Sequence, residues 1–133
     1  MTETNQGDNM TRIRSSSSSS ERIPARYQAS VVVLKGYAEG MEYIIDRTSA
    51  VIGRDKHAHI RLKDPLISRE HAAIAFREGT FVLRDLESTN GTVMNGVSIK
   101  QADLRHGDTF RMGDTVLQFV LEDTGKTSTY EIA

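Results

Sequence analysis

The 133-residue sequence contains no cysteine, and this absence removes several kinds of chemistry at once. Disulfide bridges, zinc sites built from thiolates and cysteine nucleophiles are all excluded. The formal net charge is only −1, so the chain lacks the basic surplus of a general binder of nucleic acid or of anionic membranes. The composition therefore predicts neither a nucleic-acid partner nor a membrane partner.

Long apolar runs are also missing. No stretch approaches the roughly 18 apolar residues of a membrane-spanning helix, and the N-terminus has no apolar segment of the secretory type. We therefore expect a cytoplasmic protein. The hydrophobic share of 38% and the charged share of 26% are typical of a globular domain with some polar extension.

The polar extensions lie at the two ends of the chain. Residues 1–29 are polar and include six consecutive serines, Ser15 to Ser20, so they cannot bury enough apolar surface to offset the entropy of ordering. We expect a disordered tail there, one folded domain over residues 30–122, and a polar tail or a connector to a further domain over residues 123–133.

Short apolar or alternating runs fill the middle of the chain, and turn residues separate them at close intervals. The runs span residues 30–35, 41–46, 49–54, 57–62, 70–76, 80–86, 97–99, 108–112 and 115–121. No convincing amphipathic helix is present. Many short strands at this spacing are typical of an all-β sandwich or barrel.

Three of the predicted loops carry side chains that suit an anion. The first has Gly53 and Arg54, the second runs from Ser68 to His71, and the third is S-T-N-G, residues 88–91. Guanidinium groups bind phosphate oxygens in pairs, and hydroxyls and turn amides satisfy the remaining oxygens. If the loops meet at one end of a sandwich, they form a phosphate site. The alternative is that these polar side chains simply stay solvated.

The same motifs carry a resemblance to a known family. G-R at 53–54, D-P-L-I-S-R-E-H at 64–71, S-T-N-G-T at 88–92, N-G at 95–96 and L-R-H-G-D-T-F at 104–110 occur in the order and spacing of the forkhead-associated (FHA) domain. The resemblance covers residues 30–122. Val93-Met94 departs from the family's usual pair, at a position that concerns packing.

The resemblance implies a fold and a set of binding residues. The fold is a sandwich of two twisted, mainly antiparallel sheets of about 11 short strands, with binding loops at one end, and it recognises phosphothreonine in an extended peptide. The implied phosphothreonine-binding residues are Arg54, Ser68, Arg69, Thr89 and Asn90. The implied structural supports are Gly53, His71, Gly91, Asn95 and Gly96. For Asn90 a second interpretation is a turn residue at positive φ.

The tails suggest how such a module is used. Phosphorylation of Thr2, Thr4 or Thr11 by a Ser/Thr kinase would place a ligand on the domain's own tail, in competition with a phosphothreonine-containing partner. In bacteria, similar domains are often fused to an output module such as a diguanylate cyclase, so this chain is also interpretable as the regulatory part of a signalling protein.

Three other functions fit the sequence less well. A protein–protein adaptor that works without phosphate would not need Arg54 together with Ser68. A hydrolase would use Ser68, His71 and Asp85, but the sequence has no G-x-S-x-G elbow and no phosphate-binding Walker loop. His57 and His59, on one face of a predicted strand, lack a third metal ligand. We expect no enzyme, no metal and no cofactor.

Overall fold

The computed structural model describes residues 22–125, which form eleven β-strands. The strands are β1 (Tyr27–Lys35), β2 (Glu42–Ile45), β3 (Ser49–Gly53), β4 (Ile60–Arg61), β5 (Ala72–Arg77), β6 (Thr80–Asp85), β7 (Thr92–Met94), β8 (Val97–Ile99), β9 (Gln101–Leu104), β10 (Thr109–Met112) and β11 (Thr115–Asp123). Within this part of the chain no helix is long and apolar enough to cross a membrane.

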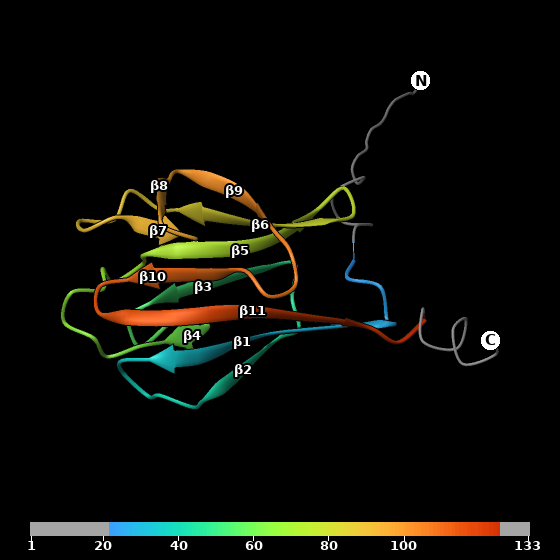
Figure 1. Cartoon of the computed structure of the whole chain (residues 1–133), viewed down its shortest axis with the longest axis horizontal. Coiled ribbons are helices and arrows are strands. Elements are labelled where there is room, and N and C mark those ends of the chain that lie inside the picture. Colours follow the sequence, from blue (N-terminus) through green and yellow to red (C-terminus); the bar gives the residue numbers. More distant parts are fainter. Residues whose placement is uncertain (1–21, 126–133) are drawn as a thin grey trace, which may run out of the picture.

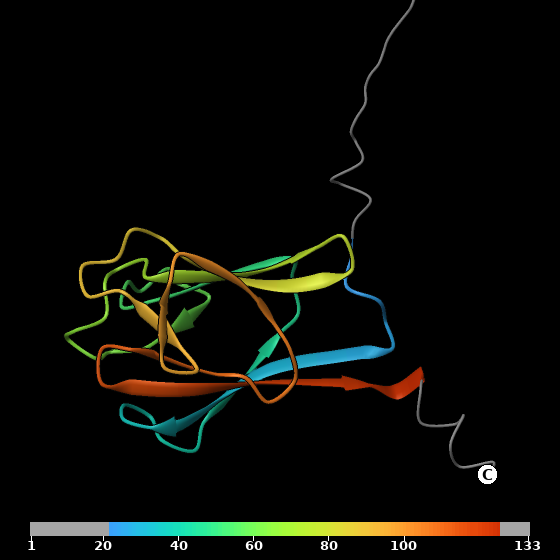
Figure 2. The same cartoon turned by 45° about the horizontal axis from the view of Figure 1, so that its top comes forward.

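Two sheets form a sandwich (Figures 1 and 2). One sheet has the order β2-β1-β11-β10-β7-β8 and the other has the order β4-β3-β5-β6-β9. Every pairing is antiparallel except that of β3 with β4. The all-β sandwich class and the number of strands are therefore confirmed.

The core lies between the two sheets because each long strand alternates buried and partly exposed side chains. In β11, Thr115, Leu117 and Phe119 are buried, while the intervening residues are only partly covered. Across the core, the ring of Phe119 meets that of Phe81 in β6 at a centroid distance of 5.2 Å. This contact holds the two sheets face to face.

The first strand begins three residues before the predicted boundary at residue 30. Tyr27 pairs with Asp123 of β11, and its ring packs edge-on against Phe76 at 6.3 Å. Arg26 forms an ion pair with Asp123 at 3.3 Å. The predicted boundary at 29/30 was therefore three residues too late. Residues 27–29 look polar in the sequence, but they continue the strand because β11 pairs with them. Of the predicted tail, residues 1–21 lie outside the described residues, as do 126–133 of the C-terminal segment.

Other strand predictions need correction. Strands β7 and β9 were not predicted, since β7 has three residues and β9 is polar. The run 57–62 is a strand only at Ile60–Arg61. His57 lies in a turn, so it does not share a strand face with His59, whose Nδ1 accepts a hydrogen bond from the Val51 amide at 2.9 Å. Among the described residues no group of three potential metal ligands comes together.

One end of the sandwich carries the loops of interest. The β1–β2, β3–β4, β4–β5 and β6–β7 loops and the β10–β11 turn lie at the left of Figure 1. The described chain begins and ends at the opposite end. The fold thus gathers three loops that are far apart in sequence, as the sequence predicted for an anion site.

Candidate functional site

The β3–β4 and β4–β5 loops are joined by their backbones. The amide of Arg54 donates to the carbonyl of Ser68 at 3.0 Å, and the amide of Asp55 donates to the carbonyl of Arg69 at 3.1 Å. This short ladder places the side chains of Arg54 and Ser68 on neighbouring segments. It also requires Gly53, because a Cβ at that position would collide with the carbonyl oxygen of Arg69.

The Arg54 side chain is exposed but anchored. Its Nε donates to the carbonyl of Ile67 at 2.9 Å. No other partner of this guanidinium occurs among residues 22–125, so both terminal amino groups remain able to donate. The hydrogen bond from Nε holds the guanidinium group of Arg54 in place, which lowers the entropic cost of binding an anion.

The Ser68 hydroxyl connects the second loop to the third. Its oxygen accepts a hydrogen bond from the Thr89 amide at 3.0 Å. Because the oxygen is the acceptor, the hydroxyl proton remains free to donate to another group. Thr89 itself is exposed at the same place. Ser68 and Thr89 are therefore in contact.

Asn90 does not have the positive φ of the alternative interpretation. The non-glycine residues with positive φ in the described chain are Ala38, Glu78, Glu87 and Asn95. The Nδ2 of Asn90 donates to the carbonyl of Leu66 at 2.8 Å. This bond ties the β6–β7 loop to the β4–β5 loop and leaves the side-chain oxygen and one N–H for a ligand.

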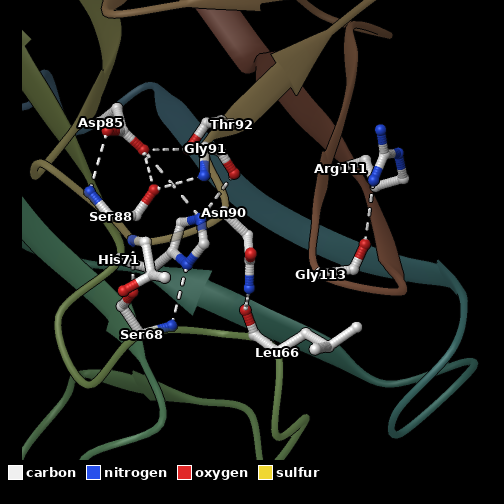
Figure 3. A network of polar contacts seen from close by, with 11 residues as sticks. Leu66, Ser68, His71, Asp85, Ser88, Asn90, Gly91, Thr92, Arg111 and Gly113 are labelled. Atoms are coloured by element: carbon white, nitrogen blue, oxygen red, sulfur yellow. Dashed lines mark hydrogen bonds and ion pairs between the residues drawn. The ribbon is translucent and has the colours of Figure 1, made fainter.

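His71 lies at the centre of the loops and is fully buried (Figure 3). Its Nδ1 accepts a hydrogen bond from the Ser68 amide at 3.0 Å, so the proton lies on Nε2, which donates to the carbonyl of Gly91 at 2.8 Å. One ring thus links the second loop to the third. This arrangement suits the structural role predicted for His71.

Asp85 was not predicted as a support of the site. Its carboxylate accepts hydrogen bonds from the hydroxyls of Ser88 at 2.6 Å and Thr92 at 2.7 Å, and from the Ser88 amide at 3.1 Å. Burial raises the pKa of Asp85, but these hydrogen bonds outweigh burial and hold the pKa below its ordinary value of 3.8. Asp85 thereby holds the β6–β7 loop in place through Ser88 and Thr92. The spacing D-x-x-S was the available signal.

Asp64 is a second buried carboxylate that the prediction missed. It accepts hydrogen bonds from the amides of Leu66 and Asp114 and from the hydroxyl of Thr115, at 2.8 to 2.9 Å. Burial raises the pKa of Asp64, but the three hydrogen bonds lower it below the ordinary value. Asp64 joins the β4–β5 loop to the β10–β11 turn.

The remaining predicted residues lie at different places. Arg69 is exposed beside Ser68, and no hydrogen bond of its side chain occurs within the described residues. Gly91 has a φ of 83°. Asn95 and Gly96, at φ 49° and 85°, form the β7–β8 turn, and the Asn95 side chain bonds Asp108 and Thr109. Asn95 therefore supports strand β10 and makes no hydrogen bond to Arg54 or Ser68.

The three elements of a hydrolytic triad are near one another but wrongly connected. The Nδ1 of His71 bonds the backbone amide of Ser68, not its hydroxyl. The Nε2 of His71 is 4.0 Å from Asp85 and donates to a carbonyl instead. No base therefore contacts the Ser68 hydroxyl in the way that acyl transfer requires. This geometry supports the expectation that these residues are not a triad.

Comparisons with known proteins identify the family of this chain. The model of the FHA domain matches residues 50–113, which include all three loops. FhaA of Mycobacterium tuberculosis, an FHA domain-containing protein, is 38% identical over 74 residues, which are 56% of this chain and 14% of FhaA. The oxoglutarate dehydrogenase inhibitor of Corynebacterium glutamicum is 32% identical over 104 residues, 78% of this chain and 72% of the inhibitor.

The fold comparison gives the same result. A chain solved in a study of phosphothreonine-dependent FHA domain interactions superposes with a TM-score of 0.65 at 31% identity, over 70% of this chain and 95% of that one. The match to the FHA model, the identity to relatives and the shared fold show that this chain belongs to the forkhead-associated (FHA) domain family.

Proposed function

We propose that the domain binds phosphothreonine in a partner protein through Arg54, Ser68, Arg69, Thr89 and Asn90. The observation that carries this proposal is the anchored Arg54 fork beside the Ser68 hydroxyl, whose oxygen is already occupied by the Thr89 amide. The two terminal amino groups of Arg54 and the hydroxyl proton of Ser68 have no acceptor among the described residues. A phosphate group, with a charge of about −1.5 to −2 near pH 7, supplies the missing acceptors.

The other three residues extend the site along a peptide. The free oxygen and N–H of Asn90 suit a peptide backbone, which has one acceptor and one donor per residue. Arg69 adds a second positive charge at the mouth of the loops. Preference for threonine over serine would come from a slot for the γ-methyl group, which is worth roughly 1–3 kcal/mol in a fitted pocket.

The regulatory role follows from the same site. Relatives carry names such as oxoglutarate dehydrogenase inhibitor and glycogen accumulation regulator. We propose that this domain, too, acts by occupying a partner or releasing it, under control of a Ser/Thr kinase. A phosphothreonine at Thr2, Thr4 or Thr11 would compete for the site, and an attached output domain such as a diguanylate cyclase would be a target of the same switch. These threonines lie outside the described residues.

A titration of the full chain followed by NMR tests the proposal. The probes are a peptide around Thr4 with and without phosphate, followed by a degenerate phosphothreonine library. We expect shifts at Arg54, Ser68, Arg69, Thr89 and Asn90 with phosphorylated peptides only. Absence of shifts with every phosphorylated probe overturns the proposal and favours an adaptor that does not need phosphate.

A further inference from the structure

Strand β2 leaves one edge of the larger sheet open. It is the terminal strand, paired only with β1, so no strand among the described residues covers its other side. Such an edge presents backbone N–H and C=O groups that can pair with another extended segment. The open edge runs beside β1 at the lower margin of Figure 1.

The β1–β2 hairpin, which includes this edge, carries several exposed apolar side chains. Six large hydrophobic residues in the described chain are exposed, and four of them belong to the β1–β2 hairpin. We call these four residues the hairpin patch: Leu34, Tyr37, Met41 and Ile44. Leu34 lies at an irregularity in the pairing of β1 with β11, and such bulges often redirect a side chain near a binding site.

The other edge strands lack this combination. Strand β4 has only two residues, and β9 presents the polar side chains of Gln101 and Asp103. Strand β8 exposes Val97, but Lys100 follows directly after it. Lysine, proline and short length are the usual protections against unwanted strand pairing. Strand β2 has neither lysine nor proline, and the carboxylate of Glu42 is drawn back toward β1 by the Ser30 hydroxyl at 2.7 Å.

The β1–β2 hairpin is linked by hydrogen bonds to the three loops of the proposed phosphate site, the β3–β4, β4–β5 and β6–β7 loops, which we call the phosphate loops. The Tyr37 amide donates to the Thr115 hydroxyl at 3.4 Å, and that hydroxyl donates to Asp64 at 2.9 Å. Asp64 in turn holds the loop that carries Leu66, whose carbonyl accepts from Asn90. In Figure 3 the Leu66 side chain extends away from the His71 network, on the side of Gly113. The hairpin and the phosphate loops thus belong to the same end of the sandwich (Figure 1).

We propose that the β2 edge binds an extended, apolar segment of the same phosphoprotein whose phosphothreonine occupies the loops, by adding it as a strand beside β2. This inference rests on the proposed function. An added strand alternates its side chains between the two faces of the sheet. One face of β2 carries Ile44, and the other carries Tyr43 with Met41 beyond it. Apolar residues at alternate positions of the added strand would lie on one face, beside Ile44.

The length of β2 favours a ligand anchored at two points. Four residues offer few backbone hydrogen bonds, too few to hold an independent chain or a second copy of this domain. A segment tethered by a bound phosphothreonine pairs at high effective concentration, so even a short edge adds affinity. The hairpin patch would then select among phosphoproteins by the sequence of the segment that adjoins their phosphothreonine.

Two matched variants of the full chain test this inference. Ile44→Lys places a charge on the β2 edge, and Val97→Lys places the same charge on β8, where the replaced side chain is similarly exposed (67% and 63%). The probe is a library of phosphothreonine peptides with long randomised flanks. We expect the wild type and Val97→Lys to select peptides with alternating apolar residues, and Ile44→Lys to lose that selection.

Two measurements on a selected peptide complete the test. It should bind Ile44→Lys about tenfold more weakly than wild type, as after loss of one well-packed interface residue. A short peptide, cut to the phosphothreonine and its immediate neighbours, should bind all three chains equally. In hydrogen exchange, the long peptide should protect the amides of residues 41–45, whereas the short one should not.

Each failure has a distinct meaning. The inference is overturned if Ile44→Lys selects peptides with alternating apolar residues as strongly as the wild type does. It is also overturned if the wild type binds the short peptide but selects no apolar residues from the library. Either result leaves the proposed function standing. Self-association of the wild type that Ile44→Lys abolishes, with no change in peptide affinity, overturns it in favour of a second copy at the edge. Failure of all three chains to bind the short peptide overturns both proposals.

Discussion

The Arg54 side chain makes a single hydrogen bond within the described residues, and that bond leaves the rest of its guanidinium to a ligand. Arg54→Ala should lower the affinity for a phosphothreonine peptide roughly 10- to 100-fold, because a charge-assisted hydrogen bond contributes about 1.5–3 kcal/mol. Titration calorimetry measures the affinity, and thermal unfolding checks the fold. Arg84→Ala, which removes an exposed arginine from β6, is the control and should bind like wild type. Unchanged affinity in a folded Arg54→Ala chain would contradict the assignment.

Gly53 and Gly91 are both required, but for different physical reasons. Gly53 has no room for a Cβ against the Arg69 carbonyl, while Gly91 has open space around it and a φ of 83°. Gly53→Ala should destabilise the domain by about 1–3 kcal/mol through overpacking. Gly91→Ala should cost about 1 kcal/mol through backbone strain. Urea unfolding measures both changes.

The two glycine variants should also differ in binding. Gly53→Ala forces apart the ladder between Arg54 and Ser68, so it should weaken phosphopeptide binding even at temperatures where the chain is folded. Gly91→Ala leaves that ladder intact. If the two variants lost stability and affinity in the same proportion, the close approach at Gly53 would have no special role.

At the level of loops and strands, the site is held by carboxylates beneath it. Asp85 fixes the β6–β7 loop and Asp64 fixes the β4–β5 loop to the β10–β11 turn. Neither touches the space where a phosphate would bind. They keep donors that come from different loops at fixed mutual positions, which reduces the ordering cost of binding.

These carboxylates predict how stability depends on pH. The folded-state pKa of each lies below the ordinary value of 3.8, so each contributes stability that is fully present above that value. The contribution is lost as the pH falls through the folded-state pKa. The free energy of unfolding, measured with urea at a series of pH values, should therefore decline below about pH 4.

The variant Asp64→Asn/Asp85→Asn provides the comparison. Each replacement should cost about 1–3 kcal/mol at pH 7, because buried donors lose a charged acceptor. The variant's stability should then fall less steeply between pH 4 and pH 2. An equally steep decline in both chains would show that other carboxylates carry the acid sensitivity.

The sequence predicted those parts of the fold and site that depend on local pattern. The apolar run 115–121 is a property of a few neighbouring residues, and the strand that it forms was predicted correctly. Polar β9 and the early start of β1 depend on pairing with β6 and β11, which is not visible locally. Asp64 was missed for the same reason, because it bonds a residue that is 51 positions away in sequence. Asp85, by contrast, bonds Ser88 only three residues away, so a local signal existed that the prediction did not use.

At the level of the whole molecule, the site and the described chain ends lie at opposite ends of the sandwich (Figure 1). The nine-residue strand β11 spans about 30 Å between them. A tail that leaves near Arg22 must cover at least this length to reach its own phosphate loops. The three tail threonines therefore differ in what they can reach.

Phosphorylation at Thr4 and at Thr11 should have different consequences. The eleven residues from Thr11 to Arg22 span at most about 40 Å when fully extended, so phosphothreonine 11 would reach its own site only on a nearly straight path at high entropic cost. The eighteen residues from Thr4 span up to about 60 Å and can follow the surface. We expect phosphothreonine 4 to dock in its own chain and phosphothreonine 11 to dock in a second chain.

Competition with an external phosphopeptide, measured over a range of protein concentrations, separates these two cases. The chain phosphorylated at Thr4 should resist the external peptide equally at every concentration, since its ligand is intramolecular. The chain phosphorylated at Thr11 should resist it only when concentrated, and sedimentation should then show association. Arg54→Ala, combined with each phosphorylation, should remove both effects if the tail binds the phosphate loops. Resistance that is independent of concentration in the Thr11 chain would show that phosphothreonine 11 docks in its own chain, and it would contradict the expected difference between the two sites.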